Sequence, residues 1–312
     1  MIEKQRYAVE VRTTFPGREA IEYGLMEAGA LGTETADSLV TGYFATPVAE
    51  AQLRSALQEA LRIYGFQTDA ALDVKVSEFG DRDWLAEWKA HWQPVAVGRF
   101  IIAPPWFVSG PGADRGPRAG SPRGVVVATG SSDPVATARG TDTIVVRINP
   151  GMAFGTGTHE TTRLCLKALQ KHFNGGSFLD VGTGTGILAI AAAKMSQQPD
   201  LKGPPTIAAC DTDADAIEIA KENAGLNGVL DEIDFRSGSI DESTASADLV
   251  CANLTAPVIV DLLPLLLGAT CGRLVLSGIL DAQFEMVKAR LLELAVVDFE
   301  IDQDGEWIAI TV

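Results

Sequence analysis

The chain has 312 residues, of which 46% are hydrophobic, so it is long enough for two domains with a packed core. Its formal net charge of −16 argues against direct binding of nucleic acid, whose phosphates would be repelled, and suits a basic protein as partner. The four cysteines lack C-x-x-C spacing and the three histidines do not cluster, so we expect reduced core thiols and no metal site.

No segment predicts secretion or insertion into a membrane. Residues 1–12 carry charges of both signs without an apolar stretch, which does not resemble a signal peptide. The longest apolar run, residues 258–269, is interrupted by Asp261 and Pro264 and is too short for a membrane span. We therefore expect a cytoplasmic protein and a monomer. The acidic net charge has an alternative explanation, which is that it keeps the protein soluble and indicates no partner.

Residues 1–79 predict a small α+β domain. Strand patterns cover residues 7–14, 39–45 and 72–76, helical patterns cover residues 17–28 and 49–64, and residues 30–35 leave room for a further strand. This order is typical of a ferredoxin-like domain. Residues 80–94 follow as a predicted helical linker, in which Trp84, Trp88 and Trp92 share one face and are expected to pack.

Residues 95–312 predict an α/β domain with a doubly wound, Rossmann-like sheet. Apolar strands alternate there with helical patterns, as in other sheets of this class. Residues 109–141 interrupt the domain with a run rich in Gly, Pro, Ser and Arg, which we interpret as a flexible surface insert.

The segment 149–162, Asn-Pro-Gly-Met-Ala-Phe-Gly-Thr-Gly-Thr-His-Glu-Thr-Thr, is dense in Gly and Thr and precedes a helical pattern at 163–172. Such a segment can wrap a ligand, or it can cap the helix that follows. His159 is a possible proton acceptor, but a lone histidine in a glycine-rich loop is more often structural, and we favour that role.

Three glycines at alternate positions join an apolar strand to a helix in Phe178-Leu-Asp-Val-Gly-Thr-Gly-Thr-Gly186. A tight turn needs positive φ, and a cofactor can approach the backbone closely only where Cβ atoms are missing. The spacing G-x-G-x-G departs from the dinucleotide motif G-x-G-x-x-G, because position 187 is Ile. Asp180 would repel a pyrophosphate and attract a cationic amino group. The pattern resembles class I S-adenosylmethionine-dependent methyltransferases; a NAD-type domain or a plain turn is the alternative.

A second apolar strand ends in Asp211, which can accept hydrogen bonds from both ribose hydroxyls of an adenosine cofactor. It follows Gly182 by more than the usual spacing of about 20 residues. The Pro- and Gly-containing loop at 196–205 explains the excess. For Asp213 and Asp215 we favour capping of the next helix.

A third buried strand delivers Asn253 to its end, although Asn is a poor strand residue. Its side-chain oxygen and the backbone carbonyl of Leu254 could accept hydrogen bonds from a substrate nitrogen and orient its lone pair. This resembles the Asn-Pro-Pro-aromatic motif of nitrogen methyltransferases, from which it departs by placing Leu, Thr and Ala before Pro257. A turn residue that simply ends the strand is the alternative.

Five motifs occur in one characteristic order: Phe154-Gly-Thr-Gly-Thr-His159, Asp180-Val-Gly-Thr-Gly-Thr-Gly-Ile-Leu188, Cys210-Asp-Thr-Asp213, Ala252-Asn-Leu254 and Ser277-Gly-Ile-Leu280. Together they resemble the bacterial methyltransferase family that modifies the stalk-base ribosomal protein numbered eleven of the large subunit. Residues 83–106 are also similar to that family. The resemblance implies S-adenosyl-L-methionine as cofactor and a small N-terminal domain that binds the protein substrate. It does not explain the long run at 109–141.

We therefore predict an S-adenosylmethionine-dependent N-methyltransferase that modifies the α-amine, lysine side chains or both in that large-subunit protein. The expected catalytic residues are Asn253 and Leu254. The expected cofactor-binding residues are Phe154, Thr156, Thr158, Asp180, Gly182, Thr183, Gly184, Gly186, Asp211 and Asn253. The alternatives are a lysine methyltransferase of a metabolic protein, a small-amine methyltransferase, an S-adenosylmethionine-binding regulator without activity, and an oxidoreductase, which would have to bind NAD.

Overall fold

The computed structural model describes residues 6–13, 17–30, 32–36, 38–44, 46–64, 66, 72–79, 94–107, 143–149, 159–198 and 205–312. The chain divides into two compact units, Met1–Trp92 and Gln93–Val312, and each is described here by itself. The predicted linker, apart from residue 94, lies outside the described residues, as do its three tryptophans. The predicted insert at 109–141 also lies outside them.

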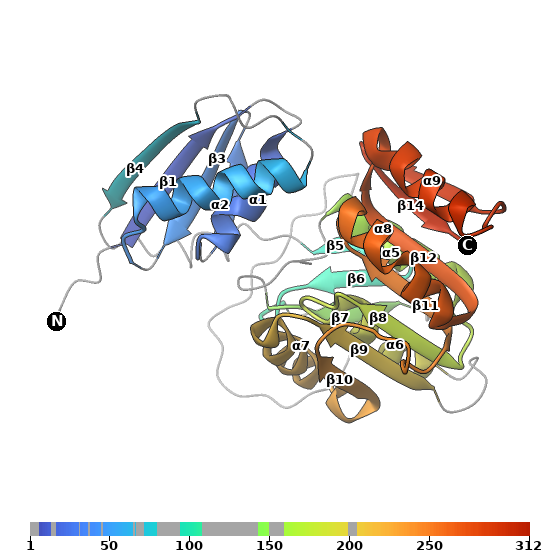
Figure 1. Cartoon of the computed structure of the whole chain (residues 1–312). Coiled ribbons are helices and arrows are strands. Elements are labelled where there is room, and N and C mark those ends of the chain that lie inside the picture. The colour runs from blue at the N-terminus through green and yellow to red at the C-terminus, as the bar shows by residue number, and fades with distance from the viewer. Residues whose placement is uncertain are drawn as a thin grey trace, which may run out of the picture. The chain divides into compact units, whose positions relative to one another are not determined.

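The first unit is an antiparallel sheet with two helices (Figure 1). Its elements are β1 (Arg6–Arg12), α1 (Arg18–Glu27), β2 (Gly32–Ala36), β3 (Leu39–Phe44), α2 (Glu50–Ile63) and β4 (Asp73–Phe79). The strand order is β2-β3-β1-β4, so β1 lies between β3 and β4. The strand expected near residues 30–35 is present as β2. The helices pack closely, because a Cβ on Gly24 would lie 3.0 Å from the Leu57 Cα atom.

The second unit contains a seven-stranded sheet in the order β10-β9-β8-β11-β12-β14-β13. Its strands are β8 (Ser177–Val181), β9 (Thr206–Asp211), β10 (Ile233–Ser237), β11 (Ala247–Asn253), β12 (Thr270–Leu280), β13 (Glu300–Asp304) and β14 (Trp307–Thr311). The first five are parallel, and β14 pairs antiparallel with both β12 and β13. The chain order reverses beside β8, where β9 lies on one side and β11 on the other. In open α/β sheets, ligands bind beyond the carboxyl ends of strands at such a switch point.

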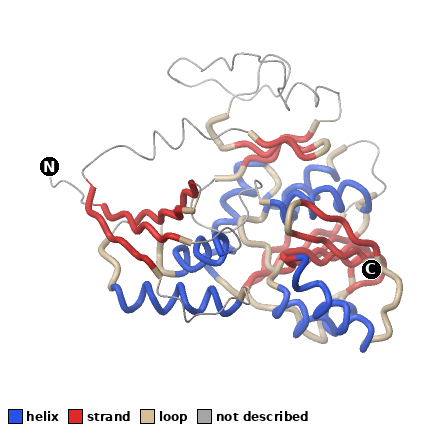
Figure 2. Tube along the Cα trace, turned by 90° about the horizontal axis from the view of Figure 1, so that it is seen from above, coloured by secondary structure: helices blue, strands red, loops and turns tan. Residues whose placement is uncertain are grey.

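Helices cover both faces of this sheet (Figure 2). They are α5 (Glu160–His172), α6 (Ile187–Ser196), α7 (Ala214–Asn227), α8 (Ala256–Gly268) and α9 (Phe284–Glu293), with short 3-10 turns η2 (Leu230–Glu232) and η3 (Asp281–Gln283). Along β11, Leu249 and Cys251 pack into the core with α5 and α6, whereas Val250 and Ala252 pack into the core with α8. Alternate residues of a strand point to opposite faces, so both faces of this sheet are buried. The predicted doubly wound α/β fold is confirmed.

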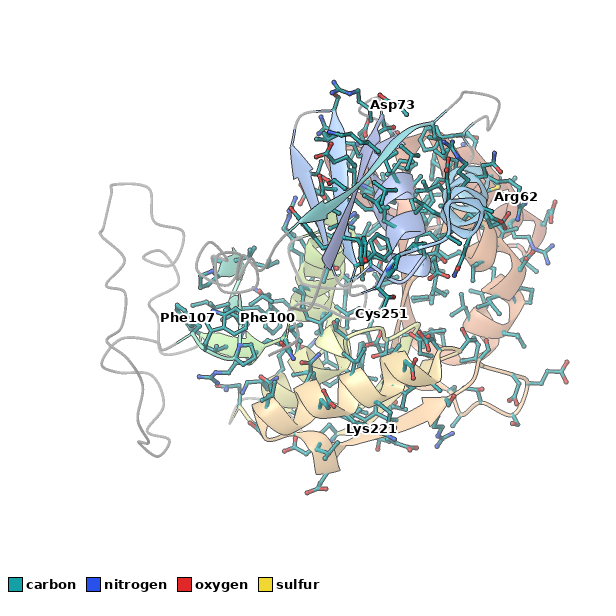
Figure 3. The ribbon with its side chains drawn as sticks, turned by 90° about the vertical axis from the view of Figure 1, so that its left-hand side faces the viewer. Arg62, Asp73, Phe100, Phe107, Lys221 and Cys251 are labelled. Atoms are coloured by element: carbon teal, nitrogen blue, oxygen red, sulfur yellow. The ribbon has the colours of Figure 1, made fainter. Side chains whose placement is uncertain are left out.

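A small three-stranded sheet accompanies the second unit. It consists of β5 (Val95–Val97), β6 (Phe100–Ala103) and β7 (Ile144–Arg147), with β6 in the middle. Phe100 is fully buried, and it is labelled in Figure 3. No sequence pattern predicts this sheet. Its strands have only three or four residues, too few for a clear periodic pattern.

Candidate active site

The glycine turn brings the ends of β8 and β11 into contact. Gly182, Gly184 and Gly186 have φ angles of +75°, +52° and +81°. A Cβ on Gly182 would lie 2.3 Å from the Leu254 Cδ2 atom, a distance that real side chains do not adopt. The backbone conformation therefore favours glycine at position 182, and a side chain there would also displace the end of the Leu254 side chain.

Asp180 is buried beneath this turn, with 1% of its surface exposed. Its Oδ2 atom accepts hydrogen bonds from the Thr183 hydroxyl at 2.7 Å and from the Ala189 amide at 3.2 Å. Ala189 lies in the first turn of α6, where free backbone N–H groups favour a negative charge. Burial nevertheless raises the pKa of Asp180 to about 7, because desolvation outweighs these two hydrogen bonds.

Asp211 lies at the carboxyl end of β9 and reaches the same turn. Its Oδ2 atom accepts a hydrogen bond from the Gly184 amide at 2.9 Å, and its Oδ1 atom accepts one from the Asp213 amide at 3.0 Å. Each carboxylate oxygen can accept a second hydrogen bond. Asp211 can therefore hold the turn and still receive ribose hydroxyls. Asp213 caps α7 by accepting from the Asp215 amide at 2.9 Å, as the sequence predicted.

Asn253 and Leu254 end β11 in a position fixed by β12. The Leu254 amide donates to the Ser277 carbonyl at 3.0 Å. The Asn253 Oδ1 atom is buried and accepts no hydrogen bond from any described residue. A buried polar atom without a partner is costly in a folded protein, and a bound ligand that donates a hydrogen bond removes that cost. The Asn253 oxygen can therefore accept a hydrogen bond from a bound donor such as an amine. The hydroxyls of Thr162 and Thr255 are likewise buried without a partner among the described residues.

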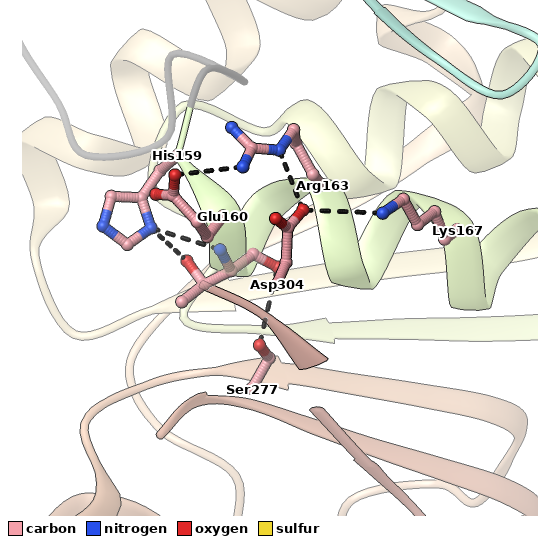
Figure 4. A network of polar contacts seen from close by, with 7 residues as sticks. His159, Glu160, Arg163, Lys167, Ser277 and Asp304 are labelled. Atoms are coloured by element: carbon pink, nitrogen blue, oxygen red, sulfur yellow. Dashed lines mark hydrogen bonds and ion pairs between the residues drawn. The ribbon is translucent and has the colours of Figure 1, made fainter. Parts of the chain in front are cut away.

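The N-terminus of α5 adjoins this region through a polar network (Figure 4). His159 is the N-cap, and its Nδ1 atom accepts a hydrogen bond from the Thr161 amide at 3.2 Å. Its ring also packs edge-on against Trp307, with the ring centroids 5.1 Å apart. Ser277 donates its hydroxyl to the Ile308 carbonyl at 3.2 Å and lies 3.5 Å from the Thr161 carbonyl. These contacts support the structural role expected for His159.

Ion pairs continue the network from α5 to the turn between β13 and β14 (Figure 4). Arg163 lies between two carboxylates, with Asp304 at 3.0 Å and Glu160 at 3.0 Å. Lys167 adds a longer contact of 3.5 Å to Asp304. The hydrogen bond from Arg163 lowers the pKa of the Asp304 carboxyl. The C-terminal strand pair thus holds α5 in place beside the end of β11.

The structure places seven of the predicted site residues together at the carboxyl edge of the sheet. They are Asp180, Gly182, Thr183, Gly184, Asp211, Asn253 and Leu254, and Gly186 closes the same turn. Phe154, Thr156 and Thr158 lie outside the described residues. The motif at residues 277–280 does not reveal the roles of Ser277 and Gly278. The Ser277 carbonyl accepts a hydrogen bond from the Leu254 amide, and Gly278 lies against the Leu254 carbonyl.

Cys165, Cys210 and Cys251 are buried, as expected for core thiols, but Cys271 is exposed. It lies near the amino end of β12, where the carboxylate of Asp248 is 3.8 Å from its sulfur atom.

Within the described ranges, no group of three His, Cys, Asp or Glu side chains could hold a metal ion. Nor does that part of the chain contain a helix that is long and apolar enough to cross a membrane.

Comparison with known proteins gives one consistent result. The family model described as "Ribosomal protein L11 methyltransferase (PrmA)" matches residues 7–114 and 122–312. A ribosomal protein L11 methyltransferase of Myxococcus xanthus (strain DK1622) is 32% identical over 315 residues, which cover 94% of this chain and 93% of the relative. One from Pelobacter propionicus (strain DSM 2379 / NBRC 103807 / OttBd1) is 34% identical over 243 residues, covering 75% of this chain and 67% of the relative.

A solved structure leads to the same group of proteins. The ribosomal protein L11 methylase from Lactobacillus delbrueckii subsp. bulgaricus superimposes with a TM-score of 0.53 and 28% sequence identity. The match covers 70% of this chain and 97% of that protein. Both units contribute to the sequence match, because the family model begins at residue 7 and continues to residue 312.

Proposed function

Because the chain belongs to the ribosomal protein L11 methyltransferase family, we propose that it transfers methyl groups from S-adenosyl-L-methionine to amino groups of ribosomal protein L11. The acceptors are the α-amine, lysine side chains or both. The observation that carries this proposal is the buried Asn253 Oδ1 atom, which has no partner among the described residues. The next residue, Leu254, lies against Gly182 of the glycine turn.

The residues at the carboxyl edge fit this cofactor. The glycine turn leaves space for backbone contact, and Asp211 retains hydrogen-bonding capacity for the ribose hydroxyls. Asp180 uses only Oδ2 for its two hydrogen bonds, so its carboxylate can also favour a nearby ammonium group. We assign Gly182, Thr183, Gly184 and Gly186 to the same site. Phe154, Thr156 and Thr158 remain proposed cofactor contacts on the basis of the sequence.

When bound, the cofactor supplies a methyl group already activated on a sulfonium sulfur. The protein then has to hold an amine nitrogen in line with that methyl group, which is mainly a matter of positioning. Asn253 Oδ1 and the Leu254 carbonyl accept hydrogen bonds from the N–H groups of the substrate amine. The nitrogen lone pair is then free to face the methyl group. The nitrogen must be unprotonated, and this costs less for an α-amine, with a pKa near 8, than for lysine, near 10.4.

The first unit is proposed to be a ferredoxin-like domain that binds the protein substrate. Its order of strands and helices supports this assignment, since both α1 and α2 connect strands of one antiparallel sheet. Ribosomal proteins that bind RNA are commonly basic, so the net charge of −16 favours their approach. We also retain the predictions of a monomer, of a cytoplasmic location and of no direct contact with nucleic acid.

The proposal is tested by incubating the full-length chain with purified L11 and S-adenosyl-L-methionine labelled in the methyl group. We expect label in L11 with the wild type and none with Asn253→Ala, at a concentration of S-adenosyl-L-methionine that saturates both proteins. Asn227→Ala is the matched control, because it also removes a buried amide but lies on α7, and it should retain transfer. Unchanged transfer by Asn253→Ala would overturn the acceptor site. Cofactor binding without labelled L11 would overturn the substrate assignment.

A further inference from the structure

A buried asparagine on α7 connects two segments at the proposed cofactor site. Asn223 is fully buried, and its Nδ2 atom donates to the Thr185 carbonyl of the glycine turn at 2.9 Å. Its Oδ1 atom accepts from the Asn149 amide at 2.9 Å, just beyond the end of β7. One side chain thus bonds both the glycine turn and the strand end that precedes the segment 150–158 in sequence.

The same face of α7 carries two further contacts. Ala220 lies against the turn, because a Cβ on Gly186 would be 3.0 Å from the Ala220 Cβ atom. Asn227 bonds both the amide and the carbonyl of Arg147, at 2.8 and 2.6 Å. Positions 220, 223 and 227 are spaced by three and four residues and share one helical stripe. Lys221 lies outside this stripe, where it pairs with Glu218 near the surface (Figure 3).

Simple packing does not require these two amides. A buried amide is tolerated only when its polar atoms are paired, so an apolar side chain would cover β7 at lower risk. What the amides add is direction, since a hydrogen bond fixes distance and angle while apolar contact fixes neither. Asn223 differs from Asn227 in one respect that matters here. It reaches the glycine turn, whereas the side chain of Asn227 bonds, within the described part of the chain, only Arg147 and the backbone of Asn223.

We propose that Asn223 is a positioning residue for the cofactor site, which holds the glycine turn in its binding conformation by tying Thr185 to the end of β7. This inference rests on the proposed function, because it takes the glycine turn as the place where S-adenosyl-L-methionine binds. Asn227 serves as the anchor of β7 on α7 and does not set the geometry of the turn.

The matched variants are Asn223→Ala and Asn227→Ala, which remove similar amides one helical turn apart. Asn223→Asp is added because it keeps the acceptor for the Asn149 amide and loses the donor to the Thr185 carbonyl. The affinity for S-adenosyl-L-methionine is measured by titration calorimetry. We expect Asn223→Ala and Asn223→Asp to weaken binding by about tenfold or more, and Asn227→Ala by less than about threefold. Urea unfolding reports how much each variant loses in stability.

Hydrogen exchange of the cofactor-free proteins provides a second readout. Amides of the turn, residues 182–186, should exchange faster in both Asn223 variants than in Asn227→Ala. The comparison is made under conditions in which the variants have the same free energy of unfolding. Equal exchange and equal affinity in Asn223→Ala and Asn227→Ala would show that Asn223 is merely structural and would overturn the inference. If the wild type does not bind the cofactor, the proposed function fails, while the exchange rates still decide whether Asn223 holds the turn.

Discussion

The carbonyl oxygen of Leu254 lies directly against the backbone of Gly278. A Cβ at position 278 would be 2.2 Å from that oxygen, and the φ angle of Gly278 is +85°, which L side chains rarely adopt. The preceding residue, Ser277, receives the Leu254 amide at 3.0 Å. The end of β12 therefore fixes both the amide and the carbonyl of Leu254. We assign that carbonyl to the acceptor site.

Gly278→Ala should displace the Leu254 carbonyl and misplace the substrate amine. We expect kcat for methyl transfer to fall by about 10- to 100-fold, because small errors in position are costly for a reaction that depends on alignment. The affinity for S-adenosyl-L-methionine should change less than kcat, since the atoms nearest to a Cβ at position 278 belong to the backbone of Leu254 and not to the glycine turn or Asp211. Steady-state kinetics and calorimetry on the same preparation check this. A loss of cofactor affinity equal to the loss in kcat would contradict the assignment.

The buried carboxyl of Asp180 should make cofactor affinity depend on pH. Burial raises its pKa to about 7, so it is largely neutral at pH 6 and gains charge as the pH rises. A charged carboxylate attracts the cationic amino group of the cofactor, which stays protonated below its pKa near 8. Affinity should therefore increase from about pH 5.5 to about pH 7 in the wild type, and calorimetry at several pH values measures this.

In Asp180→Asn the dependence of cofactor affinity on pH should disappear. The same variant also tests how Asp180 affects the stability of the fold. A carboxyl whose folded pKa is raised stabilises the fold below its unfolded pKa near 3.9, and this contribution is lost as the pH rises toward 7. The cofactor-free wild type should lose more stability than Asp180→Asn between about pH 4 and about pH 7 in urea unfolding. Parallel curves for the two proteins would show that Asp180 does not titrate in this range.

Asp211→Ala should weaken cofactor binding by removing the proposed ribose contacts and the hydrogen bond to the Gly184 amide. Hydrogen bonds that involve a charged group contribute about 1.5–3 kcal/mol, so we expect an increase in Kd of about 10- to 100-fold. Asp213→Ala is the control, because it removes only the cap of α7 and should cost about 1 kcal/mol of stability. Similar Kd values for the two variants would argue against a ribose site at Asp211.

Asp304→Asn should loosen the attachment of α5 to the C-terminal strand pair. The Arg163–Asp304 pair is partly buried, with each side chain 25% exposed, so we expect a loss of about 1 kcal/mol near neutral pH. The lowered pKa of Asp304 means that its contribution is present above the unfolded pKa near 3.9 and is lost as the pH falls through the folded value. The free energies of unfolding of the wild type and of Asp304→Asn should converge below about pH 4. A constant difference down to pH 2 would exclude the ion pair as its source.

Much of the second unit could be predicted because several of its strands are apolar and bounded by clear turn signals. The apolar strand expected before the three glycines is present as β8, and the acidic and amide residues at the ends of β9 and β11 identify the carboxyl edge. The glycine spacing predicted positive φ, and all three glycines have it. These features depend on local sequence, so they are visible without tertiary information.

The connections made through space could not be predicted in the same way. The helical pattern after Asp213 covers residues 214–223, whereas α7 continues to Asn227. Asn is a poor helix former, but Asn223 bonds the Asn149 amide, Asn227 bonds Arg147 of β7, and Gly228 caps the helix in the left-handed conformation. The contact of Gly278 with Leu254 likewise joins residues from two different strand ends. Such contacts depend on sheet order, which periodicity does not reveal.

The measurement that tests the central claim most directly is mass spectrometry of purified ribosomal protein L11, before and after incubation with the full-length chain and S-adenosyl-L-methionine. The account predicts mass gains in steps of one CH2 group, which fragment analysis places on the α-amine or on lysine side chains. An unchanged mass of L11, with a chain shown by calorimetry to bind the cofactor, would contradict it.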